Sequence, residues 1–126
     1  MRYLVLAATA LSLVSLPASA MTVAEFLAKA KSLQARGMLA AFSPDLSLLK
    51  KEMAGISAAY RADIDAARAA RRKPHSCPPP KGQARMNSTQ LLAELEKIPP
   101  PRRGMSMKAA FYGIMLRRYP CPRPGP

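Results

Sequence analysis

Apolar residues recur every three or four positions along most of the chain, which is the spacing of one face of an α-helix. The first such stretch begins with Thr22-Val23-Ala24-Glu25, a capping box in which the Thr22 and Glu25 side chains each accept from the other's backbone N–H. Gly37 is a natural stop for this helix. The sequence therefore predicts a helix over 23–36, whose inward face carries Val23, Phe26, Leu27, Ala30 and Leu33.

A longer amphipathic helix is predicted from Ser43 onward. Ser43-Pro44-Asp45 combines a serine cap, a proline at the first helical position and an acid in the first turn, all of which favour a helix start. Pro74, which follows a run of basic residues, prevents the helix from continuing. The apolar positions that share one face over about six turns are Leu46, Leu49, Met53, Ile56, Tyr60, Ile64 and Ala67.

Two shorter helices are predicted in the C-terminal part. A proline-rich loop over 74–87 ends in a cap at Asn87, which opens a helix of about 89–97 carrying Leu91, Leu92 and Leu95 on one side. Ser106 caps a last helix that ends before Pro120 and points Ala110, Phe111, Ile114, Met115 and Tyr119 inward. No segment alternates convincingly with a period of two, so we expect an all-α domain of four helices.

The first 20 residues have the pattern of a secretory signal peptide. Met1-Arg2 is a basic start, residues 4–16 form an apolar run, and Ala18-Ser19-Ala20 is a small-residue cleavage site. The run is shorter than the roughly 20 residues that a membrane span needs. We therefore expect cleavage after Ala20, export of the chain, and a single domain over 21–126.

The chain has two cysteines, Cys77 and Cys121. In an oxidising compartment such a pair is most simply interpreted as one disulfide. The bond would join the loop after the long helix to the end of the last helix. In the chain-entropy model, a closed loop of about 45 residues is worth roughly 4 kcal/mol of stability.

The stretch His75-Ser76-Cys77 raises the possibility of a catalytic Cys/His pair or a metal site. Nucleophilic catalysis requires a free thiolate, whereas Cys77 has an obvious disulfide partner, and structural zinc needs four ligands at characteristic spacings. Asp63 and Asp65 lie two apart on a helix, do not face each other, and are expected on a solvated face. The sequence predicts no enzyme, no metal and no cofactor.

Charge is the most informative remaining property. The chain has 20 basic and 7 acidic residues, a net charge of +13, and removal of Arg2 with the signal peptide leaves +12. The expected disulfide would draw Lys73, Lys81, Arg117, Arg118 and Arg123 into one basic pole. Solubilising surface charge is an equally simple explanation. The candidate partner-binding residues are Lys73, His75, Lys81, Arg85, Arg102, Arg103, Arg117 and Arg118.

Long-range electrostatic attraction draws a basic exported protein toward anionic partners, and salt weakens this attraction. Acidic protein surfaces, anionic cell-wall polymers and lipid headgroups fit the expected compartment. Nucleic acid does not fit, because export removes the chain from it and aromatic stacking residues are few. By charge alone, the chain could be an envelope-associated structural or stress protein that binds anionic cell wall or lipid.

The C-terminal half also contains an ordered set of motifs: Cys77-Pro78, Ser88-Thr89-Gln90-Leu91-Leu92, the break at Pro99-Pro100-Pro101, Ala109-Ala110, and Tyr119-Pro120-Cys121-Pro122. Over 77–122 this order resembles the family of resistance-associated and type VI amidase immunity proteins of Gram-negative bacteria. The long helix matches loosely, because Ser57-x-x-Tyr60-x-x-Asp63 keeps only the tyrosine of the family's Cys-x-x-Tyr-x-x-Gly motif. The matching structural positions are Tyr60, Pro78, Leu91, Tyr119 and Pro120.

The resemblance implies a small all-helical periplasmic protein that binds and neutralises a toxic effector. In that family the effector is typically a peptidoglycan amidase delivered by a neighbouring cell, and some members act as homodimers. A protein that plugs an active site needs a protruding loop, for which 74–86 and 98–105 are the candidates. Their prolines lower the entropy cost of presenting such a loop.

Overall fold

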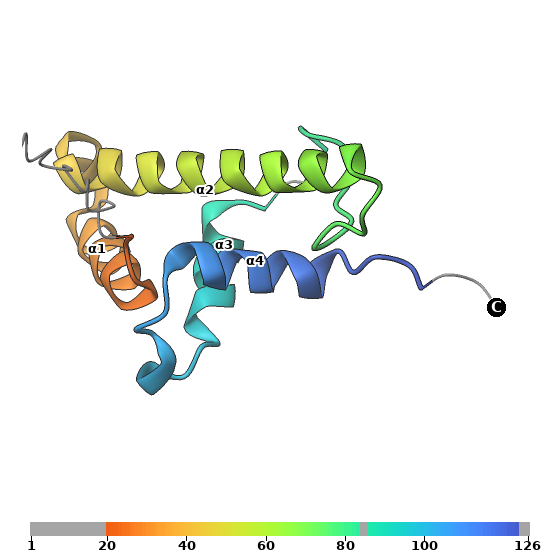
Figure 1. The fold of residues 1–126 in the computed structure, drawn as a ribbon. Coiled ribbons are helices and arrows are strands. Elements are labelled where there is room, and N and C mark those ends of the chain that lie inside the picture. The colour runs from red at the N-terminus through yellow and green to blue at the C-terminus, as the bar shows by residue number, and fades with distance from the viewer. Residues whose placement is uncertain (1–19, 84–85, 124–126) are drawn as a thin grey trace, which may run out of the picture.

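The computed structural model describes residues 20–83 and 86–123 (Figure 1). Its α-helices are α1 (Val23–Arg36), α2 (Pro44–Ala69), α3 (Ser88–Glu96) and α4 (Met107–Arg118), and its short 3-10 helices are η1 (Gly37–Phe42) and η2 (Pro100–Arg102). Within these residues there are no strands beyond a single bridge between Thr22 and Ser106. The prediction of a small all-α, four-helix domain is confirmed. The expected signal peptide, residues 1–20, lies outside the described part except for Ala20.

Each helix begins where its local cap predicts. Thr22 and Glu25 form the reciprocal capping box of α1, and Asn87 forms another at α3 with Gln90. At α2, the Ser43 side chain accepts from the backbone of the first turn, with proline at the first helical position, and Ser106 caps α4. These contacts satisfy backbone N–H groups that a helix start leaves without partners. None of the helices in the described residues is long and apolar enough to cross a membrane.

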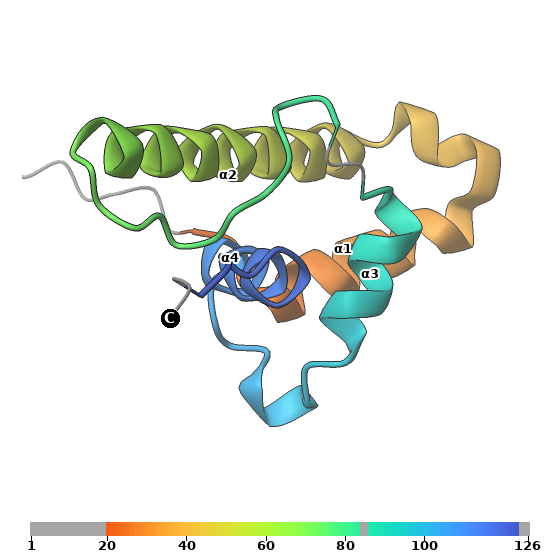
Figure 2. The ribbon, with the colours of Figure 1, turned by 90° about the vertical axis from the view of Figure 1, so that its right-hand side faces the viewer.

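α2 lies along one side of the molecule, and α1, α3 and α4 pack on the other side (Figures 1 and 2). Two backbone hydrogen bonds, Val23 N to Met105 O at 3.0 Å and Met107 N to Met21 O at 2.8 Å, join the starts of α1 and α4. The predicted inward faces form one core. Its most deeply buried apolar side chains are Val23, Tyr60, Ile64, Leu95, Met107 and Ile114.

The segment after α1 is the largest departure from the sequence-based prediction. Gly37 ends α1 as expected, with a φ of 56° that glycine adopts without steric cost. The chain then forms η1, which no pattern indicated, and exposes three large apolar side chains there. Met38 is 94%, Leu39 70% and Phe42 87% exposed. We call these three residues the apolar knob.

Candidate partner-binding site

A disulfide joins Cys77 to Cys121, with a Cα–Cα distance of 4.8 Å, as the sequence predicted. Beside it, the backbone N–H of Cys77 donates to the carbonyl oxygen of Tyr119 at 2.8 Å. The loop after α2 is therefore held against the end of α4 both covalently and by hydrogen bonding. Because both thiols are consumed, Cys77 offers no free thiolate for a Cys/His pair.

The same loop is also attached to α2. The hydroxyls of Tyr60 and Ser76 share a buried hydrogen bond, with the two residues 2% and 0% exposed. One residue further along α2, Arg61 donates from Nη1 to the carbonyl oxygen of Pro79 at 3.1 Å. Pro78, between these attachment points, is buried. Residues 76–79 therefore have one fixed position relative to both helices.

An aromatic cluster fills the space where α2, α4 and the loop meet. The ring of Tyr60 packs edge-on against Phe111 and Tyr112, at centroid distances of 5.6 and 5.3 Å. The His75 ring lies 5.4 Å from the ring of Tyr112. Such edge-to-face contacts add to the energy of area burial. The cluster thus places His75 at the surface beside α4.

Asp63 has a partner that the sequence did not reveal. Its side chain is exposed, as a solvated face requires, yet its Oδ2 accepts a hydrogen bond of 2.6 Å from the Tyr112 hydroxyl. Partial burial, and then the bond to Asp63 and its negative charge, raise the pKa of Tyr112 well above its usual value. Tyr112 therefore stays protonated and keeps α4 joined to α2 at ordinary pH.

The disulfide joins the two predicted basic segments near the C-terminal ends of α2 and α4, and Lys81 lies farther back along α2, beside Arg61 and Asp65. Lys73 and Lys81 flank the anchored loop, and Arg117 and Arg118 end α4; all four are exposed, as is Arg123 beyond Cys121. We keep the name basic pole for Lys73, Lys81, Arg117, Arg118 and Arg123.

Arg117 is also 3.9 Å from the Glu94 carboxylate of α3, at the margin of the pole. Hydrogen bonding from Lys97, with a further contribution from Arg117, lowers the pKa of Glu94, so this acid stays charged.

The remaining candidate residues lie elsewhere. Arg103 donates to the carbonyl oxygens of Ile98 at 2.8 Å and Glu96 at 3.0 Å, and so satisfies acceptors at the end of α3. Its own carbonyl accepts from Ala24 at 2.9 Å, which fixes the 98–105 segment to the start of α1. Arg102 is exposed on this segment, which projects from the side of the molecule away from α2 (Figures 1 and 2). Arg85 falls outside the described residues.

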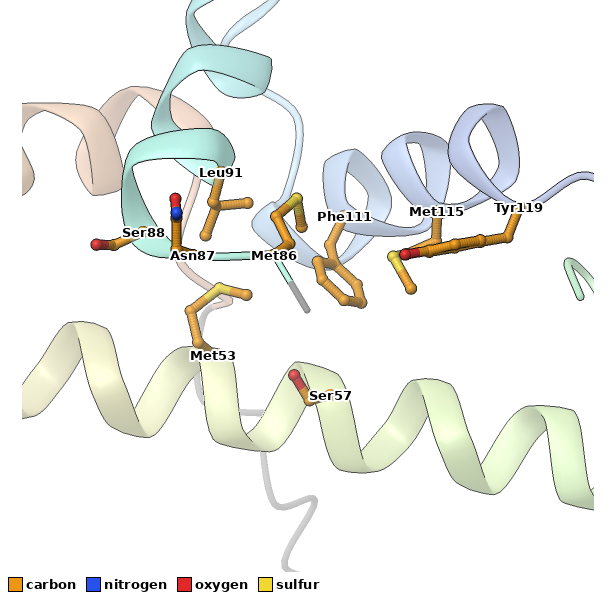
Figure 3. A pocket seen from close by; sticks show the side chains of 9 residues that line it. All are labelled: Met53, Ser57, Met86, Asn87, Ser88, Leu91, Phe111, Met115 and Tyr119. Carbon is orange, nitrogen blue, oxygen red and sulfur yellow. The ribbon is translucent and has the colours of Figure 1, made fainter. Parts of the chain in front are cut away.

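A cavity of about 340 Å³ opens between α2, α3 and α4, and its walls are mostly apolar. Figure 3 shows Met53 and Ser57 on α2 facing Phe111 and Met115 on α4. The other lining residues are Met86, Asn87, Ser88, Leu91 and Tyr119. Nothing in the spacing of these methionines along the sequence marked a cavity. Among the described residues, no group of three or more His, Cys, Asp or Glu could hold a metal ion.

Comparison of the chain with protein-family models, curated proteins and solved structures found no match. The resemblance to immunity proteins therefore stays a prediction from sequence. Of the residues that carry it, Tyr60 and Leu91 are buried on inward helix faces, and Pro78 is buried in the anchored loop. Tyr119 is half-buried and Pro120 exposed, next to Cys121.

Removing the disulfide should destabilise the whole domain. We expect Cys77→Ala/Cys121→Ala to lower the free energy of unfolding by about 4 kcal/mol, because the unfolded chain regains the entropy of an open loop. The melting temperature should fall by on the order of 10 °C or more in thermal denaturation followed by circular dichroism. A reductant should lower the melting temperature of the wild type and leave that of the variant unchanged. An unchanged wild-type curve would contradict the structural role of the bond.

The buried hydrogen bond between Tyr60 and Ser76 should contribute more to the free energy of unfolding than the exposed one between Tyr112 and Asp63. Tyr60→Phe leaves the Ser76 hydroxyl buried without a partner, at a cost of about 1–3 kcal/mol in the free energy of unfolding. Tyr112→Phe is the matched control, because water can replace the phenol at the exposed Asp63. Urea denaturation of both variants checks the order, and the double variant Tyr60→Phe/Ser76→Ala should recover part of the loss. Equal costs for the two single variants would refute the interpretation.

The raised pKa of Tyr112 makes a prediction at alkaline pH. The folded protein holds this proton more tightly than the unfolded chain, so the associated stability is complete below about pH 10 and is lost as the pH rises beyond it. The free energy of unfolding of the wild type should therefore fall relative to that of Tyr112→Phe between pH 8 and pH 11. Urea denaturation across this range measures it, and a constant difference would show that Tyr112 is not linked to folding.

Proposed function

We propose that this protein is an exported, non-enzymatic binding module that neutralises a cell-wall-degrading effector, such as a peptidoglycan amidase, in the periplasm. The observation that carries the proposal is the loop over 74–79, which is anchored at Ser76, Cys77 and Pro79 and flanked by the basic pole. A loop with one conformation loses little entropy when a partner binds it. Because Ser76 and Pro78 are buried, the side chains that this loop offers a partner are its exposed neighbours His75 and Lys81.

Export and compartment are supported by the sequence and by the disulfide. The first 20 residues have the signal-peptide pattern, and disulfides persist in oxidising compartments such as the bacterial periplasm. The motif order over 77–122 supports the immunity class. The family resemblance and the covalent anchoring of the loop thus concern the same part of the chain.

The charge distribution indicates an acidic partner surface. No acidic residue occurs between Ala66 and Ala93 or from Lys97 to the end of the chain. In space, Glu94 lies near Arg117, and Asp65 lies beside Lys81. A field of one sign raises the association rate with an oppositely charged surface, and salt screens it. The effector face that meets this pole should be rich in Asp and Glu.

Capture from periplasmic extract at about 50 mM and 500 mM salt tests the proposal, because screening lengths differ several-fold between them. We expect the wild type to retain a discrete effector protein. The peptidoglycan hydrolysis by this effector should be blocked when the wild type is bound to it. Lys73→Glu/Lys81→Glu should reduce the association rate by at least about tenfold, since it reverses charge on both sides of the loop.

The matched control is Lys31→Glu/Lys51→Glu, which makes the same change in net charge at exposed positions on α1 and in the first part of α2, away from the loop. It should bind the effector like the wild type. Equal losses in both variants would show that total charge, not the pole, drives binding. Retention of bulk cell-wall material or lipid in place of a discrete protein would favour the envelope-associated alternative.

A further inference from the structure

The apolar knob is a second surface feature, and it lies at the other end of α2 from the basic pole. Phe42 comes directly before the cap of α2, whereas Lys73 follows its C-terminus. A helix of 26 residues is about 39 Å long, so the knob and Lys73 are separated by roughly that distance. Lys81, which lies beside Ala54 and Asp65, is nearer to the knob. In Figures 1 and 2, η1 lies at the N-terminal end of α2, and the loop that contains Cys77 lies at the opposite end. The knob therefore cannot belong to the site around the disulfide.

The knob has the composition of a membrane-inserting turn. The six residues of η1, Gly-Met-Leu-Ala-Ala-Phe, have no charged or hydrogen-bonding side chain. Backbone bonds from Gly37 to Gln34 and from Ser43 to Ala40 close the two ends of the turn. Satisfied backbone groups lower the cost of leaving water. With the backbone ends satisfied, the rest of the turn surface is three large apolar side chains that are 70–94% exposed. Transfer of such side chains from water to an apolar environment is favourable.

Three cations lie near the knob in sequence, one at the end of α1 and two on α2. Arg36 reaches across the base of η1, where its Nη1 lies 3.5 Å from Ser43 Oγ, and Lys50 and Lys51 are exposed about two turns into α2. The nearest acids in sequence are Asp45, which Lys29 pairs at 3.2 Å, and Glu52, which directly follows Lys51. Lys50 and Lys51 lie about 10 Å along the helix axis from the start of α2. Interfacial segments bury their apolar face by about 5–10 Å at the boundary between headgroups and acyl chains, so these lysines would stay at the level of the headgroups.

We propose that the apolar knob, with Arg36, Lys50 and Lys51, anchors this protein to an anionic phospholipid bilayer by shallow insertion. Neither three apolar side chains nor three cations hold a protein on a membrane firmly, but the two signals together do. A second copy fits this surface less well, because both copies carry a strong positive charge. The anchor goes beyond effector binding, because it would act at the opposite end of α2 from the disulfide-anchored loop.

A tryptophan reporter tests insertion directly. The chain contains no tryptophan, so Phe42→Trp places a single fluorophore on the knob, and Leu116→Trp places one on an exposed site of α4 as the matched control. With the purified exported protein and vesicles of phosphatidylglycerol and phosphatidylethanolamine, emission from Phe42→Trp should shift to the blue. Emission from Leu116→Trp should not shift. A shift at both positions, or at neither, would overturn the proposal.

Vesicle co-sedimentation measures the separate contributions of the apolar side chains and of the cations to membrane binding. Leu39→Ser/Phe42→Ser should weaken binding to the anionic vesicles by at least about tenfold, since it removes most of the apolar surface. Leu116→Ser should stay within about twofold of the wild type, because Leu116 is exposed away from the knob. Lys50→Glu/Lys51→Glu should also weaken binding, and phosphatidylcholine vesicles should bind the wild type poorly.

Three outcomes would count against the anchor. Full binding by Leu39→Ser/Phe42→Ser would assign vesicle binding to the basic pole. Equal binding to phosphatidylcholine would remove the role of the cations. A wild-type dimer in sedimentation velocity that Leu39→Ser/Phe42→Ser converts to a monomer would make a second copy the occupant of the knob. Effector capture is measured without vesicles, so failure of the anchor leaves the proposed function to its own test.

Discussion

The bond between Cys77 and Cys121 determines which parts of this chain meet. It joins residues 44 positions apart and holds the loop after α2 against the end of α4. Beneath it, the Tyr60 and Ser76 hydroxyls satisfy each other in the core, so the loop is tied to α2 as well. In a domain this small, a covalent link of this kind contributes a share of stability comparable with the net free energy of folding. The position of the basic pole depends on it.

α2 is the longest helix of the described residues, and it connects the two surfaces discussed above. Its inward face carries core residues from Leu49 to Ala67, and its two ends carry surfaces of opposite character. At the start is an apolar turn, and at the end is a rigid loop surrounded by cations. A single helix therefore separates an exposed apolar surface from an exposed basic one. This division lets the two proposed contacts form at the same time.

Local chemistry explains why so much of the fold could be predicted. The caps at Thr22, Ser43, Asn87 and Ser106 act within three residues of themselves, so their effect can be read directly along the chain. The three-to-four spacing of apolar residues identified the buried faces of all four α-helices for the same reason. The disulfide was also predictable, because two cysteines allow one intramolecular pairing.

The site was predicted less completely, because its contacts join residues far apart in sequence. Ser76 bonds to a tyrosine 16 positions away and Tyr112 to an aspartate 49 positions away, and neither spacing has a local signature. Arg103 was grouped with surface cations by composition, although the structure uses it to satisfy the end of α3. The apolar turn at η1 was missed for a related reason. A run of Met, Leu, Ala and Phe indicates burial unless the path of the chain leaves it without neighbours.

The sequence by itself determined the helices, their caps, the cysteine pairing and the excess of positive charge, because each depends on residue identity or on short-range spacing. Only the tertiary structure decided which cations gather around the loop, which of them serve the fold, and which apolar side chains remain in water. Those outcomes depend on how α2 and α4 cross and where the disulfide closes the chain. Long-range packing, which no local pattern encodes, sets that geometry.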